Sequence, residues 1–182
     1  MSLVTSNKAL LDGIKSWLGV ITVILGGCYS VFEYIEHKQA VKVQRSLAYV
    51  EKYRSGDTAD AKLSLNQLLI DNTNDLNALL VKKYASNDEL SKAYHSYVLN
   101  ITKPTSTQRN IEVLFSFYEE VSICVERHLC DDEITQSFLA NDAKTMFNSY
   151  YPYICHLRKQ WKNDSVYRKT QMFYLGKDDI CM

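Results

Sequence analysis

The stretch Trp17-Leu-Gly-Val-Ile-Thr-Val-Ile-Leu-Gly-Gly-Cys-Tyr-Ser-Val-Phe-Glu-Tyr-Ile35 decides how this chain is organised. No charged side chain occurs between Lys15 and Glu33. As a helix rising about 1.5 Å per residue, that uncharged run is about 25 Å long, close to the hydrocarbon thickness of a bilayer. Aromatic side chains that favour the membrane interface lie toward its ends: Trp17, Tyr29 and Tyr34. The stretch therefore predicts a single transmembrane helix over residues 17–35.

The segments on either side extend this helix. Residues 1–16 carry apolar side chains at helical spacing and predict an amphipathic interfacial segment. After the span, no helix-breaking residue occurs before Ser55-Gly56-Asp57, so residues 36–54 predict a stalk helix continuous with the span. Residues 58–182 are then left to form one cytosolic helical domain.

The distribution of basic residues predicts the orientation. Lys8 and Lys15 precede the span, whereas five basic residues follow it before residue 55: Lys38, Lys42, Arg45, Lys52 and Arg54. The positive-inside rule therefore places the C-terminal domain in the cytoplasm, with the N-terminus outside. The five Cys are scattered without a metal-binding spacing, which favours reduced thiols in the same compartment.

A lipoprotein is the alternative at the N-terminus. Leu25-Gly26-Gly27-Cys28 resembles a lipoprotein cleavage site that follows a basic start and an apolar run. However, the apolar run continues beyond Cys28, and the basic residues cluster downstream of it. These two features favour the uncleaved span.

One face of the span carries small residues followed by ionisable ones. Small residues four apart let transmembrane helices approach closely. An ionisable side chain at a membrane boundary is a candidate functional residue, although it can also simply lie among the headgroups. The stripe thus predicts a face for self-association or for lining a pore: Thr22, Gly26, Ser30, Glu33 and His37.

The rest of the chain predicts an all-α fold. Six Gly and two Pro are too few for a sandwich or barrel. Apolar side chains recur at helical spacing, and we expect five to seven helices in the domain. The clearest is residues 107–129, which carry an apolar face; the other expected pieces are 58–71, 76–80, 86–98, 132–138, 142–162 and 166–174.

Charge is uneven along the domain although the formal net charge of the chain is zero. Residues 112–133 are acidic, and residues 158–177 are basic. The two segments could pair within one domain, pair between subunits of a ring, or leave a basic surface for an anionic ligand.

No enzymatic motif occurs, and we expect no catalytic residue, metal or cofactor. The sequence has no Gly-rich phosphate loop, no His-Glu-x-x-His and no G-x-S-x-G. Basic residues interleaved with aromatic ones near the C-terminus suit phosphates and bases, although they could equally be an ordinary solvated helix. The candidate ligand-binding residues are Arg109, His156, Arg158, Lys159, Trp161, Arg168 and Lys169.

Three further segments carry a resemblance: Ile111-Glu-Val-Leu-Phe-Ser-Phe-Tyr-Glu-Glu-Val-Ser122, Leu129-Cys-Asp-Asp-Glu-Ile134 and Tyr150-Tyr-Pro-Tyr-Ile-Cys-His-Leu-Arg158. Together with the N-terminal span, they resemble a family of one-span helical bacterial proteins over about residues 17–160. The layout is similar to that of type III CRISPR membrane effectors, and less so to a pore-forming accessory protein of RNA-targeting CRISPR systems.

This resemblance implies an antiviral effector whose cytosolic domain binds cyclic tetra-adenylate. Binding would drive homo-oligomerisation and permeabilise the inner membrane, and no double-stranded nucleic acid would be bound. The alternative is a membrane-anchored adaptor, or a pore-forming accessory protein, that docks a protein partner without a nucleotide.

Overall fold

A computed structural model describes residues 3–176 and 181, with side chains described for 17, for 21–176 and for 181. The described part is all-α and contains no strand. Its helices are α1 (Leu3–Arg54), α2 (Gly56–Asp71), α3 (Thr73–Val81), α4 (Asn87–Ile101), α5 (Thr105–Glu126), α6 (Asp132–Trp161) and α7 (Arg168–Leu175). The expected all-α fold is confirmed.

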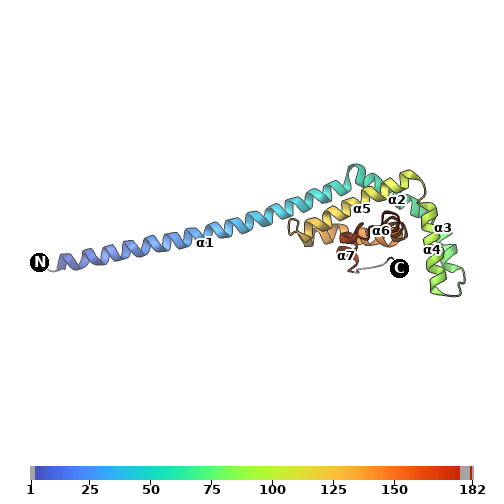
Figure 1. Ribbon diagram of the computed structural model, residues 1–182. Coiled ribbons are helices and arrows are strands. Elements are labelled where there is room, and N and C mark those ends of the chain that lie inside the picture. Colours follow the sequence, from blue (N-terminus) through green and yellow to red (C-terminus); the bar gives the residue numbers. More distant parts are fainter. Residues whose placement is uncertain (1–2, 177–180, 182) are drawn as a thin grey trace. The chain divides into compact units, whose positions relative to one another are not determined.

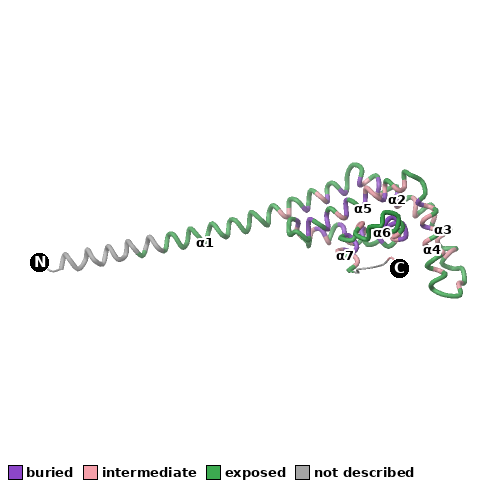
Figure 2. Tube along the Cα trace, viewed as in Figure 1, coloured by how far each residue is buried: buried purple, intermediate pink, exposed green. Residues whose placement is uncertain are grey.

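The chain divides into two compact units, residues 1–41 and residues 42–182. The first unit is part of α1, which runs unbroken to Arg54. Figure 2 shows its described residues as exposed, and apolar side chains from Trp17 to Ile35 are among them. The expected amphipathic segment, residues 1–16, lies outside the described side chains. Among the residues that are described, no helix is both long enough and apolar enough to qualify as a membrane span.

The second unit is built around α5. Nine residues of α5 are buried, and all seven positions of its expected apolar face are among them: Ile111, Leu114, Phe115, Tyr118, Val121, Cys124 and Val125. Figure 1 shows α2 running alongside α5, and α7 also packs on α5. The end of α1 belongs to this core, because Val50 and Tyr53 are buried and the Tyr53 hydroxyl lies 3.2 Å from that of Tyr118.

Helix α6 begins at Asp132, where the sequence predicts a helix start, but it is longer than expected. The Asp131 carboxylate accepts a hydrogen bond from the Ile134 amide at 3.1 Å. The expected break near Asn141 is wrong, because one helix runs from Asp132 to Trp161. Leu139 and Ala143 are buried on either side of that point, so tertiary packing outweighs the weak helix propensity of Asn and Asp.

Pro152 lies inside α6, where it cannot donate a backbone hydrogen bond to the carbonyl of Asn148. The Tyr94 hydroxyl of α4 donates to the neighbouring Ser149 carbonyl at 3.0 Å. Tyr150 and Tyr153 are buried beside the proline, and Tyr151 stacks on Tyr94. These tyrosines therefore pack the core around Pro152.

Candidate functional site

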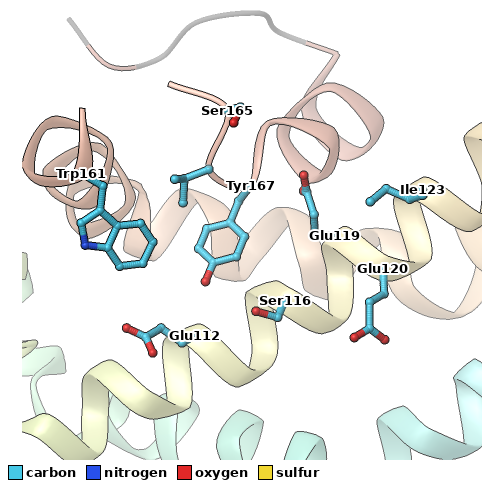
Figure 3. A pocket seen from close by; sticks show the side chains of 9 residues that line it. Glu112, Ser116, Glu119, Glu120, Ile123, Trp161, Ser165 and Tyr167 are labelled. Atoms are coloured by element: carbon cyan, nitrogen blue, oxygen red, sulfur yellow. The ribbon is translucent and has the colours of Figure 1, made fainter. Parts of the chain in front are cut away.

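A groove lies on the face of α5 opposite the core, between α5 and the link that joins α6 to α7. Its volume is about 510 Å³. Its lining, drawn in Figure 3, consists of Glu112, Ser116, Glu119, Glu120, Ile123, Trp161, Ser165, Val166 and Tyr167.

Helical spacing places the α5 side of this lining. Glu112, Ser116, Glu120 and Ile123 recur every three or four residues, so they share one face of the helix. The apolar positions between them point into the core. The groove floor is therefore the polar face of the helix that organises the domain.

The opposite wall depends on two left-handed residues. Lys162, with φ of 50°, ends α6, and Tyr167, with φ of 53°, precedes α7. These turns bring residues 165–167 back over α5, where they line the groove together with Trp161. The Trp161 side chain is 51% exposed, although tryptophan usually buries most of its surface. An indole open to solvent at a groove wall is available to a ligand.

Glu119 performs a structural task at the edge of the groove. Its Oε2 accepts hydrogen bonds from the Thr170 amide and the Thr170 hydroxyl, both at 2.8 Å, and its Oε1 accepts one from the Lys169 amide at 3.2 Å. These amides belong to the first turn of α7, where no side-chain cap is provided locally. Glu119 therefore caps α7 from another helix, and its charge complements the helix dipole.

The two remaining carboxylates differ. Glu120 forms an exposed ion pair with Lys52 at 2.9 Å. Glu112 is half-buried, and no ion pair to it occurs among the described residues. Figure 3 shows the carboxylate of Glu112 directed into the space below the Trp161 indole and the Tyr167 ring. Glu119 caps α7 and Glu120 pairs with Lys52, so Glu112 is the groove carboxylate most available to a ligand.

The electrostatic influence of Glu112 is visible on the neighbouring tyrosines. Burial, followed by the charge of Glu112 and then by Tyr167, raises the pKa of Tyr153 to about 12. Burial also raises the pKa of Tyr167, and Glu112 and Glu119 add to the rise, whereas a hydrogen bond with Ser116 opposes it. Both phenols stay neutral near pH 7, so the groove carries negative charge from its carboxylates alone.

A carboxylate beside two aromatic rings suits a cation. The faces of Trp and Tyr attract ammonium and guanidinium groups, and a carboxylate adds a charge-assisted hydrogen bond. The same charge repels phosphates. Among the described residues no three His, Cys, Asp or Glu side chains gather as metal ligands.

Of the residues proposed to bind a ligand, Trp161 lines this groove, and the basic ones do not. Arg158 is buried, and its guanidinium donates to the Val166 carbonyl at 2.9 Å and to Cys181 Sγ at 3.6 Å. Lys169 forms an ion pair with Glu126. Arg158 therefore holds the α6–α7 link in place, and the Lys169 pair joins the acidic and basic segments within one domain.

The other proposed ligand residues are dispersed. His156, Lys159 and Arg168 are exposed on α6 and α7. Arg109 lies in the first turns of α5, beside a separate hollow that Asp57 and Asp60 also line. Those two acids reduce the attraction of Arg109 for a phosphate.

The proposed span face lies on α1. Thr22, Gly26, Ser30, Glu33 and His37 are exposed, and the Ser30 hydroxyl donates to the Gly26 carbonyl at 2.9 Å. A Cβ added at Gly26 would meet nothing within 4 Å. The space that close helix packing requires is therefore present, and self-association stays a prediction.

The expectation of reduced thiols is wrong for four of the five cysteines. Disulfides join Cys124 to Cys130 and Cys155 to Cys181, and only Cys28 is free among the described residues. The sequence spacing misled because Cys155 and Cys181 are 26 residues apart yet have Cα atoms 5.3 Å apart in the fold. Disulfides favour an oxidising compartment, so cysteine usage no longer supports a cytoplasmic domain.

The groove was not predicted from the sequence. The sequence pattern that belongs to the groove is the polar residues Glu112, Ser116 and Glu120, four apart on the helix with the clearest apolar face. That pattern is typical of any solvated helix face. What distinguishes it is the return of Trp161 and Tyr167 over this face, which depends on backbone turns that no motif marks.

Comparisons with known proteins give a family without an activity. No match was found among curated proteins or among solved structures. Residues 20–175 match the family described as a domain of unknown function, DUF4760. This chain belongs to the DUF4760 family.

Proposed function

We propose that this protein is a membrane-held docking module whose helical domain binds a cationic side chain of a protein partner. The observation that carries the proposal is the groove in which Glu112 faces the Trp161 and Tyr167 rings. A lysine ammonium or an arginine guanidinium from a partner would lie against the aromatic faces and donate to the carboxylate.

The shape and charge of the groove favour this ligand over a cyclic oligonucleotide. Three carboxylates line it, and a nucleotide would bring several phosphates toward them. Of the basic residues expected to hold phosphates, Arg158 is buried and Lys169 is paired. Binding of cyclic tetra-adenylate stays a prediction and becomes the comparison ligand in the test.

The membrane part of the proposal rests on α1. Apolar side chains point outward around most of its segment from Ile21 to Ile35, outside the face that carries Thr22, Gly26 and Ser30, and Val23 is 74% and Tyr29 68% exposed. A helix that is apolar around most of its circumference is normally covered by lipid or by protein. We place this segment in or against a bilayer, with its basic continuation near the headgroups.

The two disulfides bear on the compartment. All four cysteines described within residues 42–182 are paired, which favours a domain on the oxidising side of the membrane. We therefore propose the orientation opposite to the one that the basic residues predict.

The test uses the fluorescence of Trp161 in the full chain, with Trp17→Phe removing the other tryptophan. N-acetyl-arginine amide and N-acetyl-lysine amide serve as probes, and N-acetyl-norleucine amide is the neutral control. We expect saturable change with the two cationic probes alone. Glu112→Gln should abolish it, whereas Glu133→Gln, on exposed α6 surface, should not.

Two results would overturn the proposal. One is an equal response to the neutral amide. The other is saturable binding of cyclic tetra-adenylate that survives Glu112→Gln while the cationic probes give no response.

A further inference from the structure

The end of α3 exposes apolar side chains far from the groove. None of the nine residues of α3 is buried. Leu80 is 60% exposed and Val81 is 82% exposed, whereas Leu76 and Leu79, on the adjacent face, are half-buried. Figure 1 shows α3 and α4 as a pair joined by the short connection that follows Val81. This end of the helix therefore presents aliphatic surface to solvent.

Basic and aromatic residues follow directly. Lys82 and Lys83 are exposed, and Lys82 Nζ lies 5.8 Å from the centre of the Tyr84 ring. We call residues 80–84 the α3 tip. It combines two aliphatic side chains, two ammonium groups and one tyrosine within five consecutive residues.

The acids next to the α3 tip are already engaged elsewhere. Asp88 forms an ion pair with Lys92 at 2.6 Å. The Glu89 carboxylate accepts a hydrogen bond from the Ala85 amide at 3.0 Å, and the Glu89 amide donates to Ser86 Oγ at 3.3 Å. These two hydrogen bonds stabilise the start of α4. The ion pairs among the described residues leave Lys82 and Lys83 out.

We propose that the α3 tip is a contact site for an anionic lipid surface. Leu80 and Val81 would enter the boundary between headgroups and acyl chains, and Tyr84 would lie at the headgroup level. The two ammonium groups would meet lipid phosphates, which provides the charge complementarity that selects an anionic surface over a neutral one.

A bilayer fits this arrangement better than a protein surface does. Two lysines on flexible stems adapt to a fluid layer of phosphates, whereas a protein partner would require carboxylates at fixed positions. The contact would add a second point of attachment, on the helical domain itself, to the one proposed for α1. It is independent of the groove and of what the groove binds.

The test reports on the α3 tip alone. In the full chain carrying Cys28→Ser, Val81→Cys is labelled with an environment-sensitive nitrobenzoxadiazole dye, without reductant so that both disulfides stay closed. The protein is mixed with vesicles of phosphatidylcholine alone or of phosphatidylcholine with phosphatidylglycerol. We expect a blue shift of the emission, and quenching by a spin-labelled acyl chain, with the anionic vesicles only.

Matched variants separate the effect of the α3 tip from that of net charge. Lys82→Gln with Lys83→Gln should weaken the response about fivefold per lysine. Lys103→Gln with Lys144→Gln removes the same charge from two exposed positions outside the α3 tip and should leave the response unchanged. A dye at Leu63→Cys, another exposed aliphatic position at 66%, should stay in an aqueous environment.

Three outcomes would overturn it. The first is no blue shift at residue 81 with either type of vesicle. The second is an equal shift at residues 63 and 81. The third is an equal loss of response in the Lys103/Lys144 and Lys82/Lys83 double variants, which would show that net charge alone attracts the protein.

Discussion

Two helical segments of this protein are rich in apolar residues, and they use them in opposite ways. In α5 the apolar side chains repeat along one face, and nine residues are buried. In α1, residues 21–35 carry apolar side chains around most of the helix, and every one of them is exposed within its unit. Phe115, at 0% exposed, and Phe32, at 59%, represent the two cases. The comparison shows that periodicity, and not apolar content, decides whether a helix stabilises this domain.

Phenylalanine truncation gives the largest expected contrast. Phe115→Ala should lower the free energy of unfolding by about 3 to 5 kcal/mol, because it removes a fully buried ring and leaves a cavity. Phe32→Ala should change it by no more than about 0.5 kcal/mol. Denaturant unfolding followed by circular dichroism measures both. A large loss with Phe32→Ala would mean that residues 21–35 stabilise the domain directly.

Replacing the cysteines of the two helices should give a smaller difference in the free energy of unfolding than the phenylalanine variants do. Cys124 in α5 is joined to Cys130, and replacing both with Ser should lower the free energy of unfolding by about 2 kcal/mol, since the disulfide closes a short loop. Cys28→Ser in α1 should have no effect. In the absence of reductant, maleimide should label Cys28 alone, and mass spectrometry of the labelled peptides checks this. Labelling of Cys124 in protein taken directly from cells would contradict the proposed oxidising compartment.

Replacing a glutamate on each helix should give the smallest difference in the free energy of unfolding. Glu119→Ala removes the cap on the first turn of α7 and should lower the free energy of unfolding by about 1 kcal/mol. Glu33→Ala, on exposed α1, should leave it unchanged. Hydrogen exchange adds a local readout, because the amides of Lys169 and Thr170 should lose protection in the Glu119 variant. Unchanged exchange at those amides would refute the capping role.

Much of the fold follows from local sequence. Ser86 caps α4 and Asp131 caps α6, as polar residues before apolar periodicity predict. The chain also breaks at Ser55 as expected, because Gly56 takes a positive φ of 62° that other residues rarely adopt. The start of a helix and its buried face depend on residues close together in the sequence, so both can be predicted from the sequence.

Most of the features that were missed are long-range, and the exception is the Cys124–Cys130 disulfide, whose residues are six apart in the sequence. The Cys155–Cys181 pair, the unbroken α6 and the groove each depend on contacts between residues distant in the sequence. Arg158 illustrates the problem, since a basic residue near the end of a polar helix predicts a surface ligand site, yet its guanidinium is buried beneath Val166. Its spacing on the helix cannot reveal a loop that returns over it.

The cap that Glu119 provides to α7 has a consequence for the order of folding. Helix α7 has eight residues, too few to persist as an isolated helix in water. The capping contact joins residues 51 positions apart, so we expect that loop to close only after α5 and α6 have come together. The α6–α7 link that carries Tyr167 would then settle late, after most of the core has formed. A chain arrested before that step would have a nearly complete core and no groove, so partner binding would report that folding had finished.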